Sequence, residues 1–334
     1  MHFMHKTVDI YSFFLFDKPT EAWYNKEEMG HSPQKTPARR DESRERKRIM
    51  AVNNGIFIRF PKGLEKALTL SYDDGVYEDI RLVEIMQKHG LRGTFNVNAE
   101  LYADKEYIPT GEKKWGKRLT REQVTELFSR EGVEPAMHGK THAHLQTMPM
   151  PQAIYEVIQD RALLEKQFGH IVRGMAYAYG TYNDESVQAL RDCGILFCRG
   201  TIPSEDTRLP VDWLRLKPTC HHNHPKMPEL CDRFLNLKIG TRDDARMFYL
   251  WGHSYEFERD DNWDRIEQFA EKMGGHEDIW YATNTEIFEY IEAFKALRFT
   301  VDMEKAYNPT ATPVWFIFHE TLYEVGAGQT VDLH

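Results

Sequence analysis

The chain has little cysteine and no excess of basic residues. Its four cysteines, Cys193, Cys198, Cys220 and Cys231, lack paired Cys-x-x-Cys spacing, so neither a disulfide framework nor a zinc ribbon is expected. The 43 lysines and arginines against 52 aspartates and glutamates give a formal charge of −9, which argues against a general nucleic-acid surface. The apolar run Tyr11–Phe16 is too short for a membrane span and lacks a small-residue cleavage site. We therefore expect no nucleic-acid or membrane partner and a cytoplasmic location.

Length and composition bound the organisation of the chain. With 334 residues, 41% of them hydrophobic and 28% charged, it resembles an ordinary soluble globular protein. Residues 1–49 contain the charge-dense run Arg39–Arg48, which cannot bury enough apolar surface to offset its ordering entropy. A solvated, weakly ordered and dispensable extension is favoured there over a nucleic-acid arm. We predict a compact domain at 50–300 and a β-strand appendage at 301–334.

Within the compact part, short β-type runs alternate with helix-like patterns. Leu68–Tyr72 is followed by the amphipathic segment Ile80–Lys88 and then by Gly93–Val97, which predicts a β-α-β unit. The alternation continues, and it predicts a parallel α/β barrel or a doubly wound sheet. The seven candidate strands are Leu68–Tyr72, Gly93–Val97, Val133–Met137, Val172–Ala178, Ile195–Arg199, Met247–Trp251 and Ile279–Ala282.

The chemically suggestive residues follow the ends of these candidate strands. In parallel barrels the carboxyl ends of the strands form the edge at which active sites are built. These residues are Asp73 and Asp74 after the first strand, His138 and His142 after the third, Tyr179 and Gly180 after the fourth, and His253 after the sixth.

Two of these motifs suggest a metal site. Asp73 and Asp74 repel each other unless a cation or a shared proton compensates them, although Asp-Gly is also a common turn dipeptide. His138 and His142 are four residues apart, a spacing that lets both face one ion, and ordinary surface histidines are the alternative. With Asp74 they make three protein ligands that leave a position for water, as in catalytic zinc sites.

Three segments resemble successive motifs of a known family. Thr69–Gly75, Glu134–His142 and Ala176–Tyr182 are similar to those of the polysaccharide deacetylases, carbohydrate esterase family four with the NodB homology fold. The resemblance covers roughly residues 65–297. It implies a deformed (β/α) barrel of about seven strands and a divalent metal held by Asp74, His138 and His142. Zinc is the first expectation for that metal, with cobalt, nickel or manganese as alternatives.

The same resemblance implies roles in catalysis. Asp73 would be the general base that deprotonates the metal-bound water, and His253 the general acid that protonates the departing amine or alcohol. The backbone N–H of Tyr179 would help to stabilise the oxyanion. Gly180, Arg199 and Trp251 are weaker candidates for substrate binding.

The chain also departs from the family pattern. Ala176 occupies the place of an arginine that usually pairs with the general base, and Arg199, at the end of the next candidate strand, is a possible replacement. Asp212-Trp213 has the residue types of the fourth motif at an uncertain location, so its role is not carried over. The segment Cys220–His224 matches no closed tetrahedral metal pattern, and we expect no second metal there, although His222 or His224 could line the substrate groove.

These observations favour a metal-dependent hydrolase that removes acetyl groups from an N- or O-acetylated oligo- or polysaccharide. A hydrolase of a non-sugar amide on the same fold is the second hypothesis. A non-catalytic carbohydrate-binding protein is the third, and the intact set of catalytic residue types argues against it.

Overall fold

The computed structural model describes residues 55–109 and 114–334. The predicted extension at 1–49 lies outside the described residues. Within them, a parallel sheet has the strand order β6-β5-β4-β3-β2-β8-β7, and β9 pairs with the first residues of β2. The strands are β2 (Lys66–Asp73), β3 (Gly93–Val97), β4 (Val133–Met137), β5 (Gly174–Ala176), β6 (Phe197–Arg199), β7 (Cys220–His221), β8 (Arg246–Gly252) and β9 (Ile279–Tyr281).

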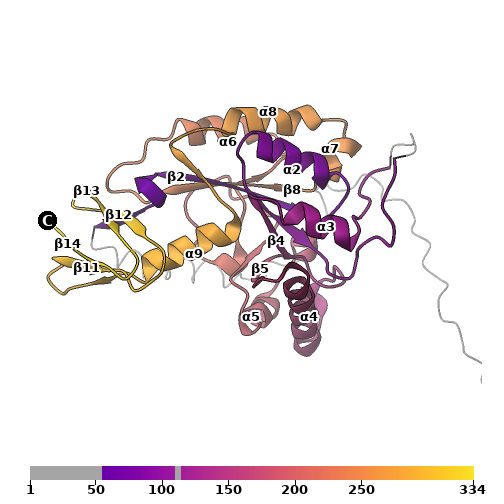
Figure 1. The fold of residues 1–334 in the computed structure, drawn as a ribbon, viewed down its shortest axis with the longest axis horizontal. Helices are drawn as coiled ribbons and strands as arrows, with labels where there is room; N and C mark the ends of the chain where they lie inside the picture. The colour runs from indigo at the N-terminus through magenta and orange to yellow at the C-terminus, as the bar shows by residue number, and fades with distance from the viewer. Residues whose placement is uncertain (1–54, 110–113) are drawn as a thin grey trace, which may run out of the picture. The chain divides into compact units, whose positions relative to one another are not determined.

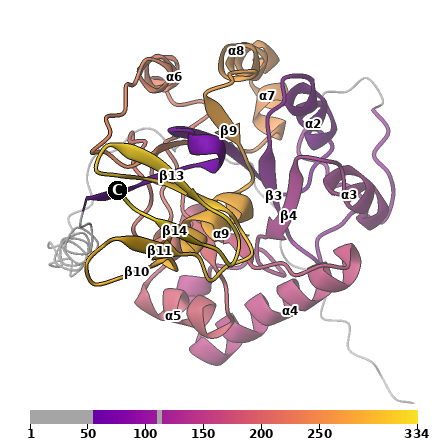
Figure 2. The same cartoon turned by 60° about the vertical axis from the view of Figure 1, so that its left-hand side comes forward.

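Helices lie around the outside of these strands, and together they form the predicted deformed (β/α) barrel (Figures 1 and 2). Three helices begin with capping boxes, in which Thr120, Asn183 and Thr283 exchange hydrogen bonds with the residue three positions later. The helices are α2 (Asp79–Lys88), α3 (Arg121–Phe128), α4 (Met150–Phe168), α5 (Asp184–Asp192), α6 (Met227–Leu235), α7 (Tyr255–Arg259), α8 (Trp263–Met273) and α9 (Asn284–Lys295).

Strand β2 is the centre of the sheet. All eight of its residues are buried, since β3, β8 and β9 pair with it and helices cover it. The predicted strand Leu68–Tyr72 lies inside β2, and its apolar residues Leu68, Leu70 and Tyr72 made it recognisable although Thr69 and Ser71 between them are also buried. Strand β7 was not predicted, because a two-residue strand carries no periodicity. Helix α6 was also missed, although Met227, Leu230 and Phe234 recur at helical spacing.

Two small antiparallel sheets lie beyond the barrel. One has the order β1-β12-β13 and the other β10-β11-β14. The predicted appendage at 301–334 contains strands β12 (Val314–Phe318) and β14 (Thr330–Asp332). The appendage is not formed by residues 301–334 alone, because two of its strands come from earlier in the chain. Its remaining strands are β1 (Ile56–Arg59), β10 (Arg298–Phe299), β11 (Lys305–Tyr307) and β13 (Thr321–Val325).

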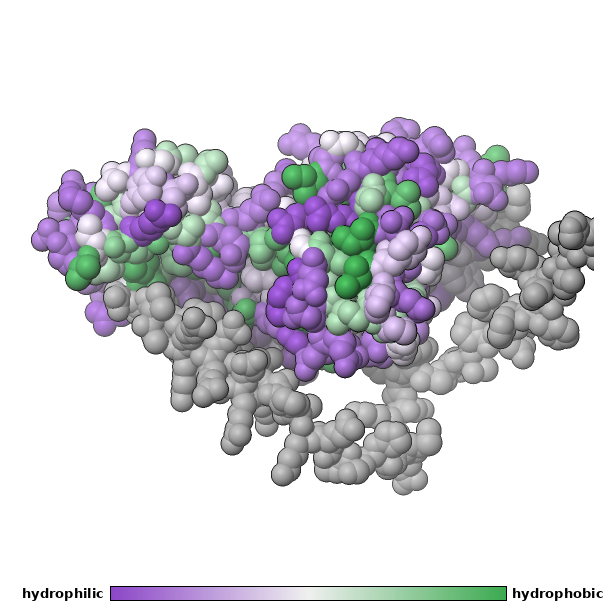
Figure 3. All heavy atoms as spheres, turned by 90° about the horizontal axis from the view of Figure 1, so that it is seen from below, coloured by the Kyte–Doolittle hydropathy of each residue, from purple (hydrophilic) through white to green (hydrophobic). Residues whose placement is uncertain are grey.

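The surface is mixed in character. On the face in Figure 3, hydrophilic residues predominate and hydrophobic residues form small groups among them. Across residues 55–109 and 114–334, no helix combines the length and the apolarity that crossing a bilayer requires. A cytoplasmic location stays a prediction.

Candidate active site

The residues predicted to share one edge of the sheet do so. Asp73 is the last residue of β2, His138 directly follows β4, and His253 directly follows β8. The chain turns sharply after β2, where Asp74 and Gly75 have φ values of 89° and 64°. A Cβ atom on Gly75 would lie 2.9 Å from Val97 Cγ1, so both the backbone angle and the space favour glycine.

Asp74, His138 and His142 form a group that could hold a metal ion. The two Nε2 atoms of the histidines are 3.2 Å apart, and Asp74 Oδ1 lies 4.0 Å from His138 Nε2 and 3.9 Å from His142 Nε2. Burial lowers the pKa of His138, and burial together with the nearby His138 lowers that of His142 to about 4. Both imidazoles are therefore neutral near pH 7, the state that binds a metal.

The tautomer of His138 also fits this role. Its Nδ1 lies 3.0 Å from the carbonyl oxygen of Ala176, and a carbonyl can only accept, so Nδ1 carries the proton. The lone pair is then on Nε2, which faces Asp74 and His142. Asn98 Nδ2 donates to the carbonyl oxygens of His138 and Gly139, at 2.8 and 2.6 Å, and holds this loop in place. The residues present therefore fit a divalent transition-metal ion.

Asp73 is held by a buried guanidinium. Arg199 Nη2 lies 2.5 Å from both carboxylate oxygens of Asp73, and Asn96 Nδ2 donates to Oδ1 at 2.8 Å. Burial alone would raise the pKa of Asp73, but the charge of Arg199, its hydrogen bond and the nearby His253 outweigh it and hold that pKa well below its usual range. Asp73 is therefore an anion throughout the neutral range.

Arg199 takes the place expected of the missing third-motif arginine. Ala176 and Arg199 are directly opposite each other in the β5–β6 ladder, so the guanidinium comes from the neighbouring strand at the same level. Because Arg199 is fully buried, it cannot contact a substrate, and the predicted substrate-binding role does not hold. Trp251 is 7% exposed and packs over the Arg199 guanidinium at 4.4 Å, so it supports this ion pair and is not an open platform for a sugar ring.

His253, after β8, lies close to the carboxylates of both Asp73 and Asp74. Its Nε2 lies 3.9 Å from Asp73 Oδ2 and 3.9 Å from Asp74 Oδ2, and its Nδ1 lies 3.8 Å from Glu256 Oε1 on α7. Burial alone would lower the pKa of His253, but Glu256, Asp73 and Asp74 outweigh it and raise the pKa to about 8. The imidazole is therefore largely protonated near pH 7.

Tyr179 and Gly180 lie at the open side of the group. Tyr179 has a φ of 59° and is 54% exposed, and its ring stacks on His144 at 3.9 Å and lies edge-on to His142 at 4.5 Å. Gly180 has a φ of 67°, and a Cβ there would lie 2.3 Å from the Thr201 side chain, so it is required by the turn. Tyr179 and His144 are exposed rings next to the metal-ligand candidates.

Sequence reasoning missed one charged neighbour of the site. Arg118 donates to Asp74 Oδ1 at 2.8 Å, to Asn98 Oδ1 at 3.0 Å and to the backbone carbonyl oxygen of Asp74. It comes from a loop before α3, where no periodicity signals a function. Asp212, by contrast, caps the short 3-10 turn Trp213–Arg215 and pairs with Arg215 at 2.6 Å, so its described partners do not include His253.

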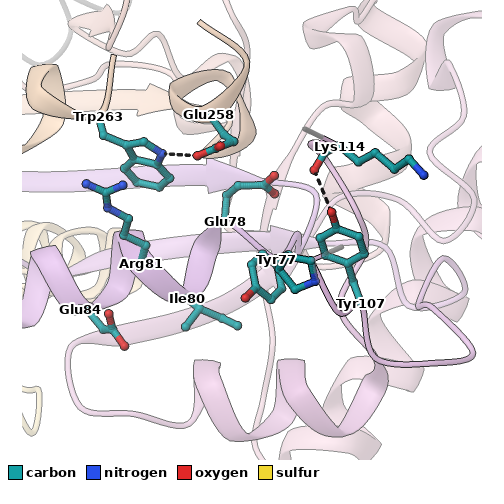
Figure 4. A pocket seen from close by; sticks show the side chains of 10 residues that line it. Tyr77, Glu78, Ile80, Arg81, Glu84, Tyr107, Lys114, Glu258 and Trp263 are labelled. Atoms are coloured by element: carbon teal, nitrogen blue, oxygen red, sulfur yellow. Dashed lines mark hydrogen bonds between the residues drawn. The ribbon is translucent and has the colours of Figure 1, made fainter. Parts of the chain in front are cut away.

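A cavity of about 510 Å³ opens beside the same end of β2 (Figure 4). It contains none of the predicted site residues, although Tyr77 and Glu78 follow the Asp73–Gly75 turn closely. Trp263 and Arg81 stack at 4.3 Å on its wall, and Trp263 Nε1 donates to Glu258. Its lining residues are Tyr77, Glu78, Ile80, Arg81, Glu84, Tyr107, Pro109, Lys114, Glu258 and Trp263.

Comparison with known proteins gives a consistent result. Residues 61–198 match a family model described as polysaccharide deacetylase. YxkH of Bacillus subtilis (strain 168), whose name assigns it to that family, is 22% identical over 148 residues, which cover 44% of this chain and 49% of YxkH. The match thus spans about half the length of this curated relative.

Two solved structures are similar to the chain, and the first of them supports the fold. A Mycobacterium smegmatis protein, whose description refers to the polysaccharide deacetylases, is 17% identical, with 71% of this chain and 94% of that chain covered and a TM-score of 0.50. The Streptococcus pyogenes deacetylase PplD in complex with acetate is 22% identical, with 48% and 64% covered and a TM-score of 0.37. Residues 61–198 therefore match the polysaccharide deacetylase family, and this match covers less than half of the chain.

Proposed function

We propose that the protein is a metal-dependent hydrolase that removes acetyl groups from an N- or O-acetylated carbohydrate. The observation that carries this proposal is the position of a carboxylate and an imidazole next to a group of metal-ligand residues. An ionised carboxylate, Asp73, and a protonated imidazole, His253, lie 3.9 Å apart next to the neutral pair His138 and His142. A base, an acid and a metal-ligand group in one place are what acyl-group hydrolysis requires.

Asp74, His138 and His142 would hold the divalent cation, zinc in the first instance. A bound divalent cation increases the acidity of water and polarises the acetyl carbonyl. Arg118 fixes the Asp74 carboxylate, and the Ala176 carbonyl fixes the His138 ring, so both ligands are oriented before any ion binds.

Asp73 would accept the proton of the attacking water. Its carboxylate cannot rotate freely, because Arg199 contacts both oxygens and Asn96 contacts one of them. The same cation keeps Asp73 ionised at neutral pH, so the base is present in its active form. Arg199 would thus have two roles. It orients the Asp73 carboxylate, and it compensates a charge that would otherwise be buried and unpaired.

His253 would donate a proton from Nε2 to the departing amine or alcohol. Glu256 stabilises the imidazolium from the Nδ1 side, which keeps the acid charged up to about pH 8. The N–H of Tyr179, in a turn with positive φ, would donate to the oxyanion, and the rings of Tyr179 and His144 offer faces on which a sugar can stack.

The test is acetate release from acetylated chito-oligomers and acetylated xylan, together with metal analysis of the purified protein. We expect EDTA to abolish acetate release and zinc to restore it. Asp73→Asn and His138→Ala should each reduce the rate of acetate release by at least about 100-fold. Asp192→Asn and His170→Ala, both exposed and outside the site, serve as matched controls.

Two outcomes would redirect the proposal. Acetate release that survives both active-site substitutions would refute the mechanism. A metal-loaded protein that releases no acetate from any sugar but hydrolyses simple amides would favour the second hypothesis, the amide hydrolase.

A further inference from the structure

A second group of ligand-type side chains lies behind His253. Strand β7 ends in His221, His222 follows it, and β7 pairs with β8 so that His221 lies opposite Trp251. Glu256, one turn after β8, thereby comes next to both histidines. Glu256 Oε2 lies 3.0 Å from His221 Nε2 and 3.0 Å from His222 Nε2.

These short contacts are not aligned as hydrogen bonds. His222 is 1% exposed, and neither of its ring nitrogens has a hydrogen-bond partner among the described residues; the same is true of Glu256 Oε2. Buried polar atoms without partners are rare because they lose their interaction with water and gain nothing. A cation held between His222 Nε2 and Glu256 Oε2 would satisfy both of these atoms.

Packing holds His222 in this position. Its ring lies against Phe257 at 4.1 Å and stacks on Tyr72 at 5.7 Å. A Cβ atom on Gly252 would lie 2.0 Å from His222 Nδ1, so the absence of a side chain at position 252 makes room for the ring. The ring is therefore confined with its Nε2 against Glu256.

We propose that His221, His222 and Glu256 form a second binding site for a divalent transition-metal ion, in addition to the Asp74 group. Two imidazole nitrogens and one carboxylate oxygen are a ligand set that zinc, cobalt and nickel accept. The other carboxylate oxygen, Oε1, faces Arg259 at 3.6 Å and His253 at 3.8 Å, which leaves Oε2 for the ion. The His221 and Glu256 side chains are 22% and 13% exposed, so an ion can reach them and water can complete its coordination.

The second site differs from the Asp74 group in its hydrogen bonding. The backbone N–H of Asn223 donates to His221 Nδ1 at 3.0 Å, so neutral His221 carries its proton on Nε2. Metal binding through Nε2 must move that proton to Nδ1 and break this hydrogen bond. His138 needs no such change, because its Nδ1 already donates to Ala176. We therefore expect the second site to bind about tenfold more weakly and to fill second, since one hydrogen bond is lost.

Metal titration of the EDTA-treated full-length protein tests this inference. We expect calorimetry with zinc to show two equivalents per chain, and cobalt to give two successive changes in the visible absorption spectrum. Glu256→Gln and His221→Gln should each remove the weaker equivalent, whereas His138→Ala should remove the tighter one. His224→Ala is the matched control, because His224 lies in the same segment but pairs with Glu205 at 3.5 Å.

Three results would decide against the second site. A single equivalent in the wild type that is lost only in His138→Ala would overturn it and leave the proposed function intact. Two equivalents in Glu256→Gln and His221→Gln would place the second ion elsewhere. Loss of the weaker equivalent together with a melting temperature well below that of the wild type, measured in EDTA, would be a folding effect and would decide against the site. His221 is the more exposed ligand, so His221→Gln should keep the wild-type melting temperature and lose the weaker equivalent only if a ligand has been removed.

Discussion

At the scale of single residues, the site depends on charges that are buried in pairs. Arg199 and Asp73 are 0% and 2% exposed, and each would carry an uncompensated charge without the other. A buried ion pair contributes little net stability, but the loss of one partner is costly. This asymmetry is a physical reason why the buried Asp73 carboxylate needs a cation such as Arg199 beside it.

Arg199→Met should therefore destabilise the protein by about 3–5 kcal/mol, because it leaves the Asp73 carboxylate buried and unpaired. Urea unfolding in EDTA measures this change without a contribution from bound metal. The double variant Asp73→Asn/Arg199→Met should lose less free energy of unfolding than Arg199→Met alone, because it leaves no unpaired charge in the interior. Equal losses in the two variants would show that Arg199 acts through its packing on Trp251.

His253 should make stability depend on pH. Its pKa is raised to about 8 in the folded protein from a usual value of 6.5, so the folded state binds the proton more tightly. The stabilisation is fully present below pH 6.5 and is lost as the pH rises through 8, and its size is about 2 kcal/mol. Unfolding of the metal-free wild type and of His253→Gln between pH 6 and 9 measures it as the difference between the two curves. A difference that does not change across this range would contradict the assigned charge.

At the scale of elements, the pairing of β5 with β6 places two positions where a side chain could reach Asp73. Ala176 on β5 and Arg199 on β6 are paired in the ladder, and side chains at paired positions point to the same face of a sheet. The guanidinium that orients Asp73 can therefore come from either strand, provided that the neighbour is small.

The double variant Ala176→Arg/Arg199→Ala moves the arginine to the neighbouring strand. It should restore part of the activity and of the stability that Arg199→Ala alone loses. We expect the double variant to recover at least about tenfold in acetate release and to raise the melting temperature above that of the single variant, since Asp73 regains a partner. Ala176→Arg alone should destabilise, because two guanidiniums would compete for one buried carboxylate. A double variant no better than Arg199→Ala would mean that the two positions are not equivalent.

At the scale of the whole molecule, the barrel and the small sheets are connected through both ends of the described chain. Strand β1 pairs with β12 over four residues, from Ile56 with Phe318 to Arg59 with Trp315. Buried Arg59 also donates to the carbonyl oxygens of Gly240 and Asp243, so the segment is fixed to the loop before β8. Strand β1 is therefore an integral part of the folded structure.

Deletion of residues 1–49 should leave the melting temperature unchanged, as the charge-dense composition of that segment predicts. Deletion of residues 1–60 should lower it by roughly 10 °C, because Ile56, Ile58 and Phe60 are buried apolar side chains that contribute about 1.5–3 kcal/mol each. Thermal unfolding of the two truncated proteins and the full chain provides the comparison. A large loss in the shorter deletion would show that the extension belongs to the folded structure.

The sequence by itself determined the local elements and the edge at which the site forms. Long buried strands such as β2 and amphipathic helices have periodic patterns, and polar residues after strand ends are placed together by parallel pairing. Asp73, Asp74, His138, His142 and His253 could therefore be named in advance. The sequence offered Arg199 only as a possible partner of Asp73, and the tertiary structure decided that contact and added Arg118, because both reach the site from other parts of the chain. Contacts between residues far apart in the chain depend on side-chain reach and packing, and these leave no periodic pattern in a single sequence.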